Sequence, residues 1–119
     1  MSTRVEVLDP AAVERLRRLG GDEFLVEMID LFLDNGPKRM AAVRDGLAAG
    51  EARAVQRAAH SLKSTAGNLG GRAVQQTAQE IETLAAEGDV APLGELVAEL
   101  ATRFDALLQR LETERSRRA

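Results

Sequence analysis

The chain of 119 residues contains no cysteine, no tryptophan and no tyrosine, and it has a single histidine. Without cysteine, disulfides, thiolate nucleophiles and cysteine metal sites are all excluded. Aromatic residues make up only 3% of the chain, whereas alanine and leucine are its commonest apolar residues. This composition favours helices, since strands prefer β-branched and aromatic side chains.

Long hydrophobic runs are also missing. No apolar stretch approaches the roughly 20 residues that a membrane-spanning helix needs, and the first residues lack the apolar core of a signal peptide. The net charge of −3 argues against a nucleic-acid partner, which requires a basic patch. The glycine-rich loops that bind ATP phosphates are absent too. We therefore expect a cytoplasmic protein that has no membrane or nucleic-acid partner and is not a kinase.

The length favours a single domain over residues 1–119, with a core at about 9–113, a loose leader at 1–8 and a loose tail at 114–119. A short helix is predicted to begin at Asp9-Pro10, where Asp caps free amides, and to end at Gly20-Gly21.

The remaining segments are four longer helical patterns. The first begins with a cap at Asp22 and reaches Gly50. At Pro37 it is either kinked or divided into two helices. The kinked helix is favoured because no polar loop intervenes. The others cover residues 51–69, 72–87 and 90–113. Short glycine turns between long helices predict an all-α, antiparallel up-down-up-down four-helix bundle with a short additional N-terminal helix.

The only histidine lies in the helix predicted for residues 51–69. One apolar stripe of this helix is formed by Val55, Ala59, Leu62, Ala66 and Leu69. His60 lies off the stripe and is predicted to point into solvent. Neutral imidazole is a nucleophile that can accept a phosphoryl group, and the ammonium of Lys63, one turn further on, can balance the added charge.

Two interpretations of this surface remain open from spacing alone. A lone histidine on a helix is commonly just a surface residue. The small side chains around His60 instead suggest a cleared approach for another protein. Gly67 costs about 1 kcal/mol relative to alanine inside a helix, and either close helix packing or partner access explains it.

A longer motif carries a family resemblance. His60-Ser61-Leu62-Lys63-Ser64, followed by Ala66-Gly67-Asn68-Leu69-Gly70, resembles the signature of the histidine-containing phosphotransfer (HPt) domain of multistep phosphorelays. The looser pattern extends from Phe24 to Ile81-Glu82. Position 64 is often glycine in this family, and serine is still small.

The resemblance implies a four-helix bundle in which His60 is phosphorylated on the ring nitrogen away from the backbone and Lys63 helps to hold the phosphoryl group. The chain would be a monomeric phosphocarrier without a cofactor or metal of its own. It would exchange phosphoryl groups with receiver domains of response regulators or hybrid histidine kinases, which supply the aspartate and the Mg²⁺. The docking surface around the histidine is expected at Gln56, Ser64, Gly67, Asn68, Gln79 and Glu82.

Glu82 stands where family members can place an amide near the imidazole. It is either a solvated flank residue or a group that favours imidazolium and repels phosphate. Two other functions compete with the carrier. A helical adaptor or decoy would bind a receiver domain without being phosphorylated. A metal-dependent or hydrolytic enzyme is disfavoured, because one histidine and no paired carboxylate motif give it no site.

Overall fold

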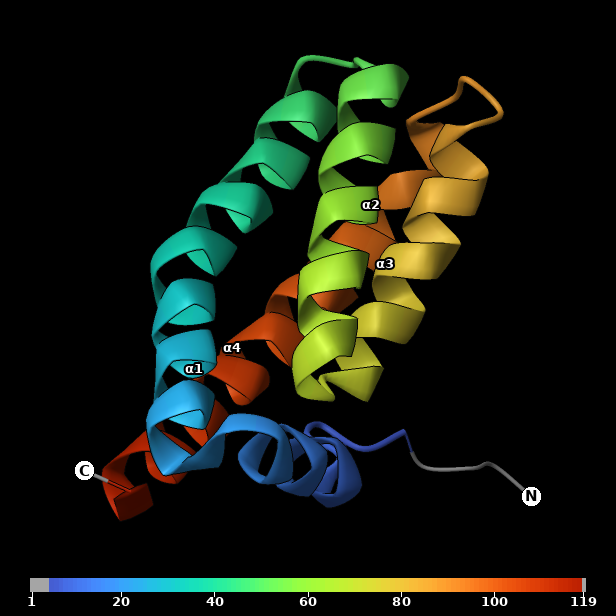
Figure 1. Cartoon of the computed structure of the whole chain (residues 1–119). Coiled ribbons are helices and arrows are strands. Elements are labelled where there is room, and N and C mark those ends of the chain that lie inside the picture. Colours follow the sequence, from blue (N-terminus) through green and yellow to red (C-terminus); the bar gives the residue numbers. More distant parts are fainter. Residues whose placement is uncertain (1–4, 119) are drawn as a thin grey trace.

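The computed structural model describes residues 5–118, and within them it is all-helical. α1 spans Pro10–Ala48, α2 spans Ala52–Leu69, α3 spans Arg72–Ala85 and α4 spans Gly94–Arg118, with a 3₁₀ turn, η1, at Ala91–Leu93. Figure 1 shows the chain rising along α1, descending along α2, rising along α3 and descending along α4, so the predicted up-down-up-down bundle is confirmed. None of these helices combines the length and apolarity needed to cross a membrane.

α1 contains the predicted short N-terminal helix. Asp9 caps it by accepting a 3.0 Å hydrogen bond from the Ala11 amide. Helical geometry breaks at Gly21, whose φ of 81° and ψ of −177° turn the chain, so the first segment lies across the lower end of the bundle in Figure 1. Only glycine adopts this conformation without strain. After the turn, the helix continues through Pro37, so the alternative of one helix is confirmed, but the only residue of α1 with non-helical geometry is Gly21 and not the predicted Pro37.

The core lies between the four helices. Its largest fully buried side chains come from every helix, and include Leu25, Ile29, Leu62, Leu69, Ile81, Leu100, Leu107 and Leu111. α1 and α4 meet at a Phe32–Phe104 pair with ring centroids 5.8 Å apart. Gly36 avoids a tight contact at this point, because a Cβ atom there would lie 3.2 Å from the Phe104 ring. The apolar stripe predicted for α2 is wholly buried.

Both chain ends differ from the prediction of a loose leader and tail. Residues 1–4 and 119 lie outside the described part, but Leu8 is only 2% exposed, and the carbonyl of Glu6 accepts from the Ala73 amide at 2.9 Å. α4 runs to Arg118, beyond the predicted end at 113. Arg115 pairs with Asp30 at 2.8 Å and Arg118 with Asp22 at 3.4 Å. These ion pairs fasten the last turns of α4 to α1.

Two predicted helix ends also shift. α3 ends at Ala85 rather than at residue 87, and the last helix begins at Gly94, after η1, rather than at residue 90. Asp89 accepts a 2.9 Å hydrogen bond from the Ala91 amide, which stabilises the short turn instead of a first turn of α-helix.

Candidate functional site

His60 lies near the middle of α2, the helix that packs between α1 and α3 (Figure 1). Its neighbours on the apolar stripe, Ala59 and Leu62, are completely buried. The imidazole itself is 60% exposed. Burial of the stripe fixes the rotation of α2, and this rotation turns the ring into solvent, as the helical periodicity predicted.

One ring nitrogen of His60 is held by α3. Nδ1 lies 2.6 Å from Oε2 of Glu82. The Glu82 side chain is only 18% exposed, so the interpretation of Glu82 as a solvated flank residue is wrong. α2 and α3 are antiparallel neighbours, and this packing places residues 22 positions apart in direct contact.

Lys63 approaches the same carboxylate from the next turn of α2. Its Nζ donates to Oε1 of Glu82 at 2.6 Å and to Oε1 of Gln79 at 3.0 Å. The amide of Gln79 is oriented in turn by donating to the hydroxyl of Thr83 at 3.0 Å. Gln79 therefore reaches Lys63 rather than the imidazole, and Lys63 is held by two acceptors on α3.

The carboxyl group of Glu82 is kept ionised by this arrangement. Its pKa is lowered from the ordinary value of 4.5, first because Lys63 donates a hydrogen bond to it and also because His60 does, while partial burial opposes the shift. An ionised carboxylate has no proton to donate. Near neutral pH, Glu82 is therefore an acceptor for both neighbours.

The tautomer of the imidazole follows from that charge. Since Glu82 accepts, Nδ1 carries the proton, and in the neutral ring the lone pair lies on Nε2. Nε2 is the ring nitrogen away from the backbone. In the neutral ring, the nucleophilic nitrogen is thus the one that Glu82 does not contact, in a side chain that is 60% exposed.

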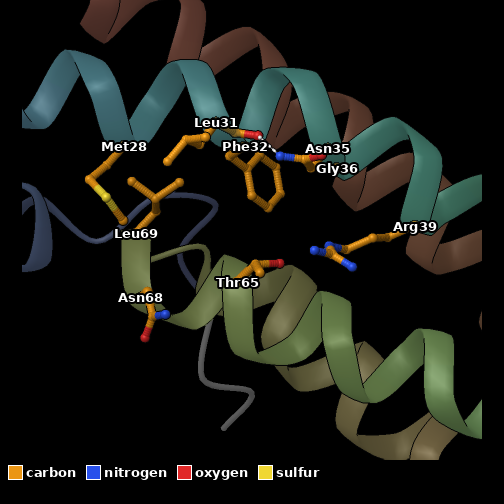
Figure 2. Close-up of a pocket in the computed structure, with 9 residues that line it drawn as sticks. All are labelled: Met28, Leu31, Phe32, Asn35, Gly36, Arg39, Thr65, Asn68 and Leu69. Carbon is orange, nitrogen blue, oxygen red and sulfur yellow. Dashed lines mark hydrogen bonds between the residues drawn. The ribbon is translucent and has the colours of Figure 1, made fainter.

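The residues predicted to surround the histidine are distributed over two helices. Gln56 and Ser64 lie one turn before and one turn after His60, with Gln56 partly buried and Ser64 exposed. Gln79 and Glu82 contribute from α3. Asn68 is exposed and lies on the other side of α2, at a cavity shared with α1 (Figure 2).

Gly67 does not provide an open approach. A Cβ atom there would lie 2.7 Å from Nε2 of Gln75, whose side chain covers the position from α3. Arg72 holds Gln75 in place by donating to its Oε1 at 3.0 Å. Of the two explanations left open by the sequence, the structure therefore favours close packing between α2 and α3 for this glycine.

The sequence assigned no role to several polar residues near the site. Gln75 shares a helix flank with Gln79 and Glu82 but was given no contact, and Thr83 was missed although it lies one turn after Gln79, whose amide it accepts from. Arg39 and Arg57 also went unnoticed. One feature of the sequence could have indicated them: neither arginine has an acidic residue three or four positions away with which to form an ion pair on its own helix.

Comparison with known proteins identifies the family of the chain. Residues 27–114 match the family model described as Hpt domain. The match leaves out the short N-terminal helix, which ends before residue 27. No curated protein sequence matches the chain.

Two solved structures are similar over nearly the whole length. Histidine-containing phosphotransfer protein B (HptB) from Pseudomonas aeruginosa PAO1 superposes with a TM-score of 0.87 at 25% identity, covering 93% of this chain and 96% of that one. The HPT domain of a sensor hybrid histidine kinase from Shewanella has a TM-score of 0.81 at 18% identity, covering 93% and 95%. At that lower identity, the likeness concerns the fold alone. With the family match covering most of its length, the chain belongs to the Hpt domain family of phosphorelay proteins.

Proposed function

We propose that the protein carries a phosphoryl group on Nε2 of His60, accepting it from the aspartyl phosphate of one receiver domain and delivering it to the aspartate of another. The observation that supports this most is the exposed imidazole with Nδ1 held 2.6 Å from Glu82. Family membership supports the same chemistry.

The phosphoryl transfer requires no proton from outside the reacting groups. The Nε2 lone pair forms the N–P bond while the bond from phosphorus to the aspartate oxygen breaks, and the aspartate leaves as a carboxylate. The ring keeps its proton on Nδ1 and acquires positive charge. Glu82, which accepts from that N–H, stabilises the charge as it develops. The Mg²⁺ for this reaction is expected on the receiver domain.

Glu82 and Lys63 have different electrostatic roles in this transfer. The carboxylate lies on the Nδ1 side of the ring, so the imidazole separates it from a phosphoryl group on Nε2. Lys63 is already bound to Glu82 and Gln79. Its first contribution is to keep Glu82 ionised and in place; direct contact with the phosphoryl group requires its Nζ to leave one of these acceptors.

A label-transfer experiment tests the proposal. The protein and its His60→Gln variant are incubated with receiver domains phosphorylated on aspartate with ³²P. We expect acid-labile, base-stable label on the parent alone, with both proteins equally helical because residue 60 is exposed. If the parent binds a competent receiver but never takes up label, the protein is an adaptor or decoy and the carrier proposal is wrong.

A further inference from the structure

A groove runs between α1 and α2 on the opposite side of His60 from Glu82. Its apolar end is a cavity of about 220 Å³ with walls that include Met28, Phe32 and Leu69 (Figure 2). Leu31 stands at its rim with 57% of its surface exposed. An exposed leucine beside an apolar hollow is a feature of surfaces that bind another molecule.

The groove continues into a basic end. Asn35 and Arg39 line both the cavity and a second hollow, which Lys38 and Arg57 border and in which no acidic residue takes part. In Figure 2, the guanidinium of Arg39 extends from α1 toward Thr65 on α2. Arg57 lies on α2 one turn before His60, so this end of the groove borders the exposed imidazole.

The two arginines of this groove, Arg39 and Arg57, have no ion-pair partner among residues 5–118. The Nε atom of Arg39 is buried and has no hydrogen-bond partner within residues 5–118. No carboxylate of the described residues lies within ion-pair distance of Arg39 or Arg57, although arginines elsewhere, such as Arg72 and Arg115, have such partners. A buried donor without an acceptor is costly. The excess of cations belongs to this end of the groove, since Leu31 at the other end also borders a hollow lined by Glu27, Asp30 and Asp34.

We infer that the groove recognises an acidic segment of the receiver domain that docks over His60, with carboxylates on Arg39 and Arg57 and an adjacent apolar side chain in the cavity. The inference rests on the proposed function, since the partner is the one that exchanges phosphate with His60. Charge complementarity selects this occupant. The groove supplies guanidinium donors, which bind carboxylates in a bidentate manner, and a neighbouring apolar hollow.

This recognition discriminates between receiver domains. A receiver with carboxylates opposite the groove pairs with the guanidinium groups of Arg39 and Arg57, whereas one with lysine or arginine there meets like charges. Such pairs affect affinity and association rate rather than the chemical step. The α1 side of His60 therefore selects the partner, and the α3 side prepares the ring for reaction.

Charge-neutral variants test the groove. Arg39→Gln and Arg57→Gln each remove one groove cation, and Leu31→Gln removes the apolar rim. Arg110→Gln is the matched control, because Arg110 is exposed on α4 and lies outside the groove. Three quantities are measured for each protein: the Kd for a receiver domain that transfers to the parent, its dependence on salt, and the rate of His60 phosphorylation by phosphoramidate, a small donor that needs no docking.

We expect Arg39→Gln and Arg57→Gln each to weaken receiver binding about tenfold and to flatten its salt dependence. Phosphorylation by phosphoramidate stays at the parental rate in both, and Arg110→Gln binds the receiver like the parent. Leu31→Gln weakens binding with an unchanged salt dependence. Thermal unfolding and circular dichroism establish that each variant is folded; Arg57 is exposed, so its variant remains informative if Arg39→Gln unfolds.

Two failures are distinguishable. If the parent exchanges phosphate with a receiver and Arg57→Gln and a folded Arg39→Gln bind that receiver with the parental Kd, the inference is wrong and the proposed function stands. If no receiver in a purified panel phosphorylates the parent, the proposed function itself fails. A carboxylate-to-lysine scan of the receiver provides the reciprocal test, since the inference requires one such change to couple with Arg39→Gln in a double-mutant cycle.

Discussion

The charged side chains on the two sides of α2 differ in whether they have partners within the chain. On the α3 side of His60, the charged groups are paired: Glu82 accepts from the imidazole and from Lys63, and Gln79 accepts from Lys63. On the α1 side, the buried Nε of Arg39 has no hydrogen-bond partner within the described residues 5–118. The charged groups of the first side are therefore paired within the chain, whereas the inferred partner of the second side is a receiver domain.

This contrast separates preparation of the nucleophile from choice of partner. Glu82, held by Lys63, fixes one orientation and one tautomer of the His60 ring before a receiver domain binds. The groove between α1 and α2 is inferred to form its ion pairs only when a receiver domain is bound. Variants on the α3 side should therefore alter the chemical step, and variants on the α1 side should alter binding.

The largest expected effect comes from Glu82→Ala. It removes the acceptor of the Nδ1–H, so both tautomers become populated and the developing ring charge loses its counter-ion. We expect phosphoryl transfer at saturating receiver to slow at least about tenfold. Glu82→Gln, which keeps an oxygen acceptor without the charge, should fall between the parent and Glu82→Ala. Stopped-flow or quenched-flow transfer assays measure the rates, and equal rates in all three proteins would remove Glu82 from the mechanism.

A smaller effect is expected on stability as pH falls. Because the pKa of Glu82 is lower in the folded protein than its ordinary 4.5, its contacts stabilise the fold fully above that ordinary value and are lost as pH drops through the lowered one. The difference in unfolding free energy between the parent and Glu82→Gln should thus shrink on acidification. Urea titrations at a series of pH values measure it. A difference that grows toward acid pH would contradict the assigned ion pair.

The smallest effect concerns Gly67. Gly67→Ala gains helix propensity but displaces Gln75 and its contact with Arg72, so we expect a near-neutral change alone. In a Gln75→Ala background, the same substitution should stabilise the protein by about 1 kcal/mol. Phosphoryl transfer should stay at the parental rate in both. Slower transfer with unchanged stability would instead support partner access as the reason for this glycine.

Local sequence signals were sufficient for the number and order of the helices, although not for every helix end. The Asp9-Pro10 cap, the Gly21 turn and the buried stripe of α2 depend on neighbouring residues and on periodicity. The exposure of His60 follows from the same periodicity. The ends of the chain were predicted less well, because the burial of Leu8 and the ion pair of Arg115 with Asp30 depend on distant segments.

The contacts of His60 could not be predicted from the sequence, because they depend on how the helices pack. The rotation of α3 against α2 decides that Glu82 rather than Gln79 contacts His60, and that Gln75 covers Gly67. No single-helix pattern contains this information. The groove was missed for the same reason, since Arg39 and Arg57 come from two helices and meet only in the folded bundle.

The central claim is that Nε2 of His60 is the reactive atom, made so by a proton fixed on Nδ1. Nitrogen NMR of protein with ¹⁵N-labelled histidine, recorded before and after incubation with a phosphorylated receiver domain, tests it directly. We predict a protonated Nδ1 in the free protein and an N–P bond at Nε2 in the product. A phosphoryl group on Nδ1, or stable label on any residue other than His60, would contradict the account.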